Sequence, residues 1–170
     1  CFQKQIQVGS SGFAQEEGID YTEFFAPVAR LEAIRIFLAH AANKDFKVFQ
    51  MDVKCAFLYG DIDEEIYVCQ PPGFEDPDHP EKVYKLDKSL YGLHQAPRIW
   101  YETLTQYLLS KGFSRGTIDM TLFKKEVDNE MMIVQVYVDD IIFGSTNEKL
   151  CRDFEEVMKD RFEMPMMGEM

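Results

Sequence analysis

The chain has 170 residues, of which 46% are hydrophobic and 14% aromatic, so it can bury the core of a globular domain. No apolar run approaches the roughly eighteen residues that a membrane-spanning helix needs, which excludes such a helix. The net charge of −12 argues against a nucleic-acid partner, because phosphate binding depends on Lys and Arg. The local charge of a binding groove can nevertheless differ from the net charge of the chain.

Cysteine and histidine placement does not fit a zinc site. The four cysteines show no C-x-x-C spacing and no neighbouring pair of histidines, so we expect reduced thiols in an intracellular protein. The chain opens on Cys1, with no methionine and no basic segment before an apolar one. We therefore expect no secretory signal and a piece cut from a longer polypeptide.

Apolar spacing, taken in chain order, predicts three helices separated by short strands. The first helix is expected over 31–43, the second begins near Pro97, and the third follows Asn147, whose side chain suits an N-cap. Strands are expected, from their β-branched and aromatic content, at 46–53, 66–69, 83–86, 121–127, 131–138 and 141–144. This order predicts an α+β fold, an antiparallel sheet with helices packed on one face.

Two adjacent acids, Asp139 and Asp140, stand between apolar runs that indicate the two strands of a hairpin. Charge is costly beside buried strands, so these carboxylates must meet water, a cation or a turn. Asp52 lies in another apolar, strand-like run. Three carboxylates on two strands can hold two hard divalent cations for phosphoryl transfer. The alternative is an ordinary hairpin turn and an acid at a strand end.

Four stretches of the sequence carry a resemblance to a known family. They are GFAQEEGIDYTEFFAPVARLEAIRIFLAHAA (12–42), FQMDVKCAFLYGDIDEEIYVCQPPGF (49–74), YKLDKSLYGLHQAPRIWY (84–101) and VQVYVDDIIFGSTN (134–147). The chain resembles the reverse transcriptase of copia-type LTR retrotransposons, as a fragment of the Pol polyprotein. The resemblance implies a right-hand RNA-directed DNA polymerase without its thumb. Residues 12–45 and 60–98 would be fingers-like, and residues 46–59 and 99–170 palm-like.

The resemblance also implies the site residues. Asp52, Asp139 and Asp140 match the catalytic acids that bind two Mg²⁺ ions, for which Mn²⁺ can substitute. Phe57 matches the aromatic gate whose ring excludes a 2′-hydroxyl, although the residues alone favour core packing for it. Nucleotide or template contacts are further expected from Val53, Gly92, Gln95, Arg98 and Tyr137.

The implied partners are a primer on an RNA or DNA template, dNTPs, and the rest of the Pol polyprotein with its thumb, RNase H and integrase. The resemblance also implies a location in a cytoplasmic virus-like particle and no membrane partner. It places the copying of RNA into DNA before DNA integration. Gln5 and Gln7 are neutral where basic residues would hold the triphosphate. The alternative is therefore an inactive remnant of a degenerate element, and we expect the 170 residues alone not to extend a primer. A further alternative is a calcium-binding module built on the acidic residues 61–65, but the sequence there does not have the ligand spacing of an EF-hand loop.

Overall fold

The computed structural model describes residues 25–63 and 65–169, so Gln5 and Gln7 lie outside the described residues. The described residues fall into two compact units, one built around residues 57–100 and the other around residues 27–56 and 101–169. Over the described ranges, no helix combines the length and apolar character needed to cross a membrane.

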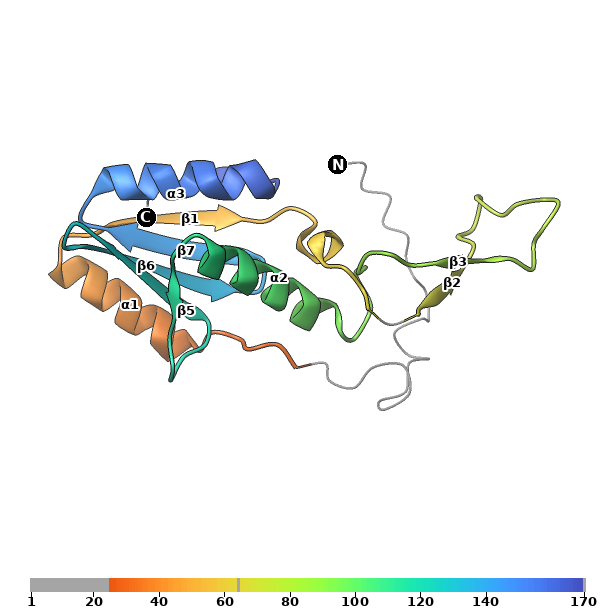
Figure 1. Ribbon diagram of the computed structural model, residues 1–170, viewed down its shortest axis with the longest axis horizontal. Helices are drawn as coiled ribbons and strands as arrows, with labels where there is room; N and C mark the ends of the chain where they lie inside the picture. The colour runs from red at the N-terminus through yellow and green to blue at the C-terminus, as the bar shows by residue number, and fades with distance from the viewer. Residues whose placement is uncertain (1–24, 64, 170) are drawn as a thin grey trace. The chain divides into compact units, whose positions relative to one another are not determined.

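The second unit is built on a six-stranded antiparallel sheet with the order β4-β5-β6-β7-β1-β8. Its strands are β1 (Lys47–Asp52), β4 (Ser114–Arg115), β5 (Leu122–Val127), β6 (Glu130–Tyr137), β7 (Asp140–Ser145) and β8 (Met166–Glu169). Figure 1 shows β1 and β6 on either side of β7. The four predicted strands of this sheet are confirmed to within one or two residues at each end, whereas β4 and β8 were not predicted.

Both hairpins that contain β6 turn through two residues. At its first end, Val127 pairs with Glu130, and the connecting residues Asp128 and Asn129 have φ values of 51° and 65°. Two consecutive positive φ values are typical of a type I′ turn, in which Asp and Asn are tolerated. The strands predicted at 121–127 and 131–138 are therefore joined by a tight two-residue turn.

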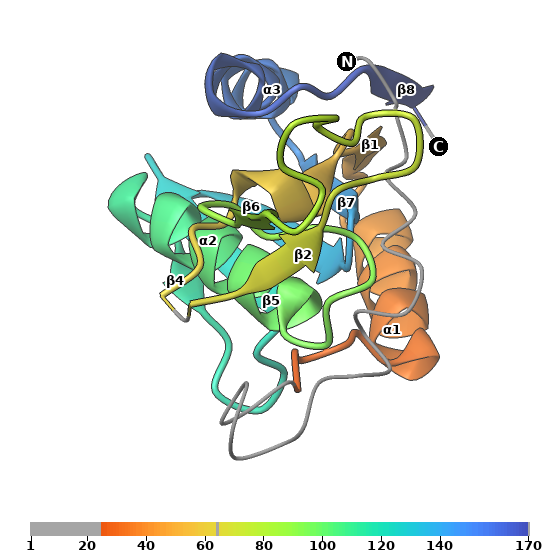
Figure 2. The ribbon, with the colours of Figure 1, turned by 90° about the vertical axis from the view of Figure 1, so that its right-hand side faces the viewer.

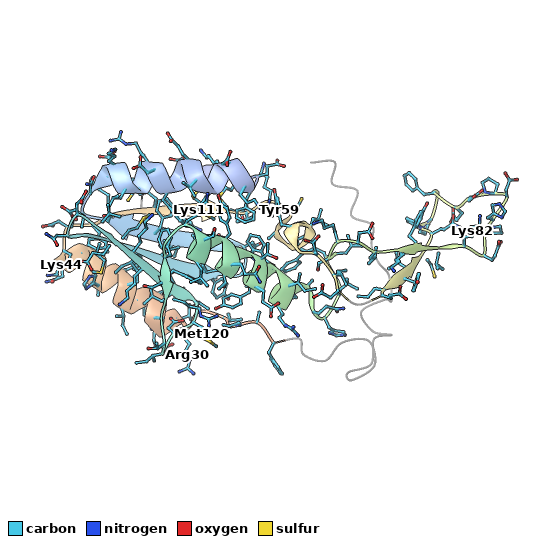
Figure 3. The ribbon with its side chains drawn as sticks, viewed as in Figure 1. Arg30, Lys44, Tyr59, Lys82, Lys111 and Met120 are labelled. Carbon is cyan, nitrogen blue, oxygen red and sulfur yellow. The ribbon has the colours of Figure 1, made fainter. Side chains whose placement is uncertain are left out.

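Three helices accompany the sheet, namely α1 (Leu31–Asn43), α2 (Ala96–Ser110) and α3 (Glu148–Arg161). The bounds of α1 are those predicted, and Figure 3 shows Arg30 and Lys44 at its two ends. The predicted cap of α3 is also confirmed, because the Asn147 side chain accepts a hydrogen bond from the backbone N–H of Lys149 over 3.0 Å. Such a bond satisfies a backbone donor that the first helical turn leaves without a partner.

One face of the sheet forms the main core. Residues opposite one another in an antiparallel pair project from the same face. Across β1, β7 and β6 this face carries the buried rows Phe49, Phe143, Val134 and Met51, Ile141, Val136. Helix α3 packs on it through Phe154, whose ring centroid lies 4.8 Å from that of Phe143. Helix α2 joins α3 through Tyr107, whose hydroxyl donates to the carbonyl oxygen of Val157 over 2.6 Å.

The opposite face of the sheet is covered at one end by α1. Phe37 and Ala41 of this helix form a buried cluster with Val48, and Ile133 and Ile142 are half-buried against it. The three strand residues project away from the main core. Figure 2 accordingly shows α1 and α2 on opposite sides of β7. The expectation of helices on one face is therefore wrong for α1, because both faces carry apolar side chains at this end of the sheet.

The first unit contains a small antiparallel pair, β2 (Tyr67–Cys69) with β3 (Val83–Lys85), and both strands were predicted. The short 3₁₀ helix η1 (Ala56–Tyr59) leads into this unit. Its buried cluster consists of Ile66, Leu93 and Ala96, with Phe57, Ile62, Leu86 and Leu90 half-buried against it. A two-stranded pair is marginal alone, so this cluster stabilises the unit.

Candidate functional site

The doublet Asp139-Asp140 lies at the second tight hairpin of β6, as the sequence predicts. Tyr137 pairs with Asp140, so Val138 and Asp139 form a two-residue connection. Val138 has φ of 54°, a conformation that β-branched residues rarely adopt. A positive φ at the first connecting residue is typical of a type II′ turn, which normally places glycine there. The hairpin therefore holds Val138 in a strained backbone conformation beside the two acids.

Strand β1 brings Asp52 to the same end of the sheet. Asp52 is the register partner of Asp140, so their Cβ atoms lie on the same face, about 5 Å apart. The backbone N–H of Val53 donates to the carbonyl oxygen of Asp139 over 2.9 Å. Two backbone relationships thus position three carboxylates from two strands and a turn.

The charges of these acids interact. The pKa of Asp52 is raised above its ordinary value, first because the carboxyl is partly desolvated and then because Asp139 and Asp140 lie nearby. Lys54 acts in the opposite direction. The nearby negative charges disfavour ionisation of Asp52, and a bound cation would relieve this repulsion.

Asp140 also accepts a hydrogen bond from a side chain on β1. The Nε2 atom of Gln50 donates to Oδ1 of Asp140 over 3.0 Å. Among residues 25–63 and 65–169, no three His, Cys, Asp or Glu side chains converge closely enough to hold a metal ion. The donor chemistry nevertheless fits a hard divalent cation, because the three carboxylates at this end of the sheet offer only oxygen ligands, and Asp139 and Asp140 disfavour the charge of Asp52.

Two further predicted residues flank the acids in the same unit. Val53 is buried and reaches Asp139 through its backbone N–H. Tyr137 is 40% exposed and stands opposite Asp140 across the hairpin, on the face that carries Asp52. Its ring is therefore available to a ligand beside the acids.

The remaining predicted residues belong to the first unit. The Phe57 ring centroid lies 4.5 Å from that of Tyr91, and Phe57 also borders the apolar cluster of the unit. Gly92 has φ of 102°, which glycine adopts without strain. Gln95 is buried, whereas Arg98 is half-buried.

A buried polar network on the same sheet face was not predicted. The Nε2 atom of Gln135 donates to Oγ1 of Thr121 over 2.6 Å and to Oδ2 of Asp119 over 3.3 Å. The Thr121 hydroxyl donates in turn to Oδ1 of Asp119 over 2.5 Å. Gln135 and Gln50 are both register partners of Ile142, in the row next to Asp52 and Asp140. Gln135 precedes Tyr137 by two residues, and Gln50 precedes Asp52 by two. Because alternate residues of a strand share a face, this spacing was the sequence signal that could have placed both glutamines on the face of the acids.

The chain is similar to proteins of one family. Residues 3–170 match the family model described as "Reverse transcriptase (RNA-dependent DNA polymerase)". The chain is 40% identical over 153 residues to the "Retrovirus-related Pol polyprotein from transposon RE2" of Arabidopsis thaliana, covering 90% of this chain and 10% of the relative. It is also 40% identical over 158 residues to the "Retrovirus-related Pol polyprotein from transposon TNT 1-94" of Nicotiana tabacum, covering 92% of this chain and 12% of the relative. The chain thus spans about a tenth of the length of these relatives.

Proposed function

Because the chain belongs to the reverse transcriptase (RNA-dependent DNA polymerase) family, we propose that it is the polymerase segment of a copia-type Pol polyprotein. In that role it adds dNTPs to the 3′-hydroxyl of a primer on an RNA or DNA template. The thumb, RNase H and integrase would come from the rest of the polyprotein, within a cytoplasmic virus-like particle.

The observation that carries this proposal is the placement of Asp52 opposite Asp140, with Asp139 tied to β1 through its carbonyl oxygen. Asp52 and Asp139 would be the main ligands, and Asp140 would contribute less to metal binding and more to positioning. Two Mg²⁺ ions, or Mn²⁺ in their place, would supply the positive charge that activates the primer hydroxyl and neutralises the leaving pyrophosphate. The protein would contribute by holding the three carboxylates in place through β1 and the hairpin.

The first unit would select the nucleotide. Phe57 would exclude the 2′-hydroxyl of a ribonucleotide by the volume of its ring, and the contact with Tyr91 supports a fixed ring position. Gly92, Gln95 and Arg98 would contact the nucleotide or template, together with Val53 and Tyr137 beside the acids. In this proposal residues 12–45 and 60–98 act as fingers, and residues 46–59 and 99–170 as palm.

A catalytically inactive remnant is the second candidate function. Its support is the neutral pair Gln5 and Gln7, at the position where the family's basic residues would hold the triphosphate. In this candidate the fold and the hairpin acids persist, whereas nucleotide binding is lost. Activity therefore separates the two candidates.

The test grafts residues 3–170 into the TNT 1-94 polyprotein in place of its matching segment and measures dNTP incorporation on an RNA template with Mg²⁺. We expect incorporation by the graft, its loss in Asp139→Asn, and its retention in the matched control Asp128→Asn at the other β6 turn. No incorporation by a folded graft would favour the inactive remnant. Equal incorporation by all three proteins would refute the role of the hairpin acids.

A further inference from the structure

Gln50 lies beside the acids but is not itself acidic. It precedes Asp52 by two residues in β1, so both side chains project from the same face of the sheet. Its register partner on β7 is Ile142, two residues after Asp140. This diagonal placement brings the Gln50 amide to Asp140, with Nε2 and Oδ1 separated by 3.0 Å.

The hydrogen bond from Gln50 distinguishes Asp140 from its two neighbours. Within the described part of the chain, no side chain donates a hydrogen bond to the carboxylate of Asp52 or Asp139. The amide of Gln50 is neutral, so it orients Asp140 without cancelling its negative charge. A lysine or arginine in its place would hold the carboxylate and also repel a cation.

Gln50 is itself held by its place in the sheet. It is half-buried on β1, with β7 on one side and β8 on the other. Its register partner on β8 is Gly168, which presents no side chain opposite the amide. The β1–β8 register shifts between Gln50 and Met51, whereas the pairing of β1 with β7 is regular and fixes the position of Gln50. Asp140 stands at the first residue of its strand.

We propose that Gln50 is a positioning residue for metal binding, which fixes the Asp140 carboxylate through Oδ1 and leaves Oδ2 for a cation. This inference rests on the proposed function, since it assigns a supporting residue to the same site. Carboxylates that bind metals are commonly oriented by such hydrogen bonds, and loss of the partner weakens metal affinity by about 10–100-fold.

The test measures Mn²⁺ binding to the 170-residue chain by the loss of the free-ion electron paramagnetic resonance signal. We expect Gln50→Met, which keeps the length and removes the donor, to weaken the tightest binding by about tenfold. Gln50→Asn, which keeps the amide but shortens its reach, should weaken it similarly. The matched control is Gln106→Met on the exposed side of α2, which should bind as the parent does. Circular dichroism verifies that each variant is folded.

A second arm separates positioning from packing. In an Asp140→Ala background, Gln50→Met should cause no further loss, because the carboxylate that it orients is absent. An equal loss in both backgrounds would assign Gln50 a packing role and overturn the proposal. Unchanged affinity in Gln50→Met, with clear loss in Asp139→Asn, would overturn the proposal and leave the proposed function intact. Equal binding by the parent and Asp139→Asn would refute the metal site, and the role of Gln50 with it.

Discussion

The backbone N–H of Val53 donates to the carbonyl oxygen of Asp139 over 2.9 Å, so the residue after Asp52 is bonded to the hairpin that carries the other two acids. This bond uses backbone atoms alone. Changing the side chain of Asp52 or Asp139 therefore leaves the connection between β1 and the hairpin in place, and effects of such changes report on the carboxylates themselves.

Asp139→Asn should leave the chain folded and abolish stabilisation by divalent cations. The substitution removes one of three repelling charges, so the melting temperature without metal should equal or exceed that of the parent. With Mg²⁺ or Mn²⁺ the parent should gain stability in proportion to the bound fraction, and the variant should not. Thermal melts with and without each ion measure both effects. A metal-dependent shift as large in the variant as in the parent would contradict the assignment.

Asp52→Asn should change the dependence of stability on pH. The pKa of Asp52 is raised in the folded chain, so the folded state binds this proton more tightly than the unfolded state does. The contribution of Asp52 to the free energy of unfolding therefore falls as pH rises from the ordinary value through the raised pKa. Above that range the full free-energy cost of the ionised Asp52 carboxylate in the folded chain is present, and Asp52→Asn removes this cost.

Denaturant unfolding of both proteins, without metal, from pH 3 to pH 8 measures this difference, where the pH limits are about one unit below and several units above the ordinary carboxyl pKa. The stability of Asp52→Asn relative to the parent should increase with pH and then level off. A difference that is constant across this range would show that neither desolvation nor the neighbouring acids raise the pKa of Asp52.

Val138→Gly should stabilise the folded chain. Val138 has φ of 54°, and strain of this kind costs on the order of 1–3 kcal/mol, whereas glycine adds about 0.4–1 kcal/mol of unfolded-state entropy. The net gain should be about 1 kcal/mol in the free energy of unfolding. The matched control is Asn129→Gly in the other β6 turn, where φ is 65° but asparagine tolerates it, so the gain should be smaller. Chemical denaturation measures both, and a loss of stability in Val138→Gly would contradict the argument.

Phe57→Ala should admit ribonucleotides in the grafted polyprotein, because the excluded volume of the ring disappears. The free energy of unfolding should fall by about 2 kcal/mol, less than for a fully buried ring, since Phe57 is half-buried. Leu58→Ala, at the exposed neighbouring position of η1, is the matched control. The ratio of dNTP to rNTP incorporation tests the gate. A less stable variant with the parent's ratio would assign Phe57 to packing alone.

The sequence allowed the helices, the main strands and the hairpin acids to be predicted, because each has a local signal. The spacing of apolar residues indicated α1 within its observed bounds, and Asn147 indicated the start of α3. The face on which α1 packs had no local signal, since an apolar stripe does not specify which side of a sheet receives it. Strand β8 was missed because its pairing with the edge of β1 depends on tertiary contacts.

The candidate site was predictable only in part for a similar reason. The acids stand out by their charge between apolar residues, whereas Gln50 and Gln135 are uncharged and each sits within a strand. Their importance comes from register, which places Gln50 diagonally opposite Asp140 and Gln135 beside Thr121. Register is set by pairing between strands distant in sequence, so a pattern within one strand does not reveal it.

Strand β6 has a two-residue turn at each end, with Asp128-Asn129 before it and Val138-Asp139 after it. The number of residues in β6 is therefore fixed by its pairing with both β5 and β7. A single inserted or deleted residue between 130 and 137 would reverse the alternation of side chains over part of the strand, turning Gln135 toward the core and Val134 toward the acids. Many point substitutions in β6 should leave a foldable sheet, whereas a one-residue change in its length would misplace the hairpin or break its pairing with β5.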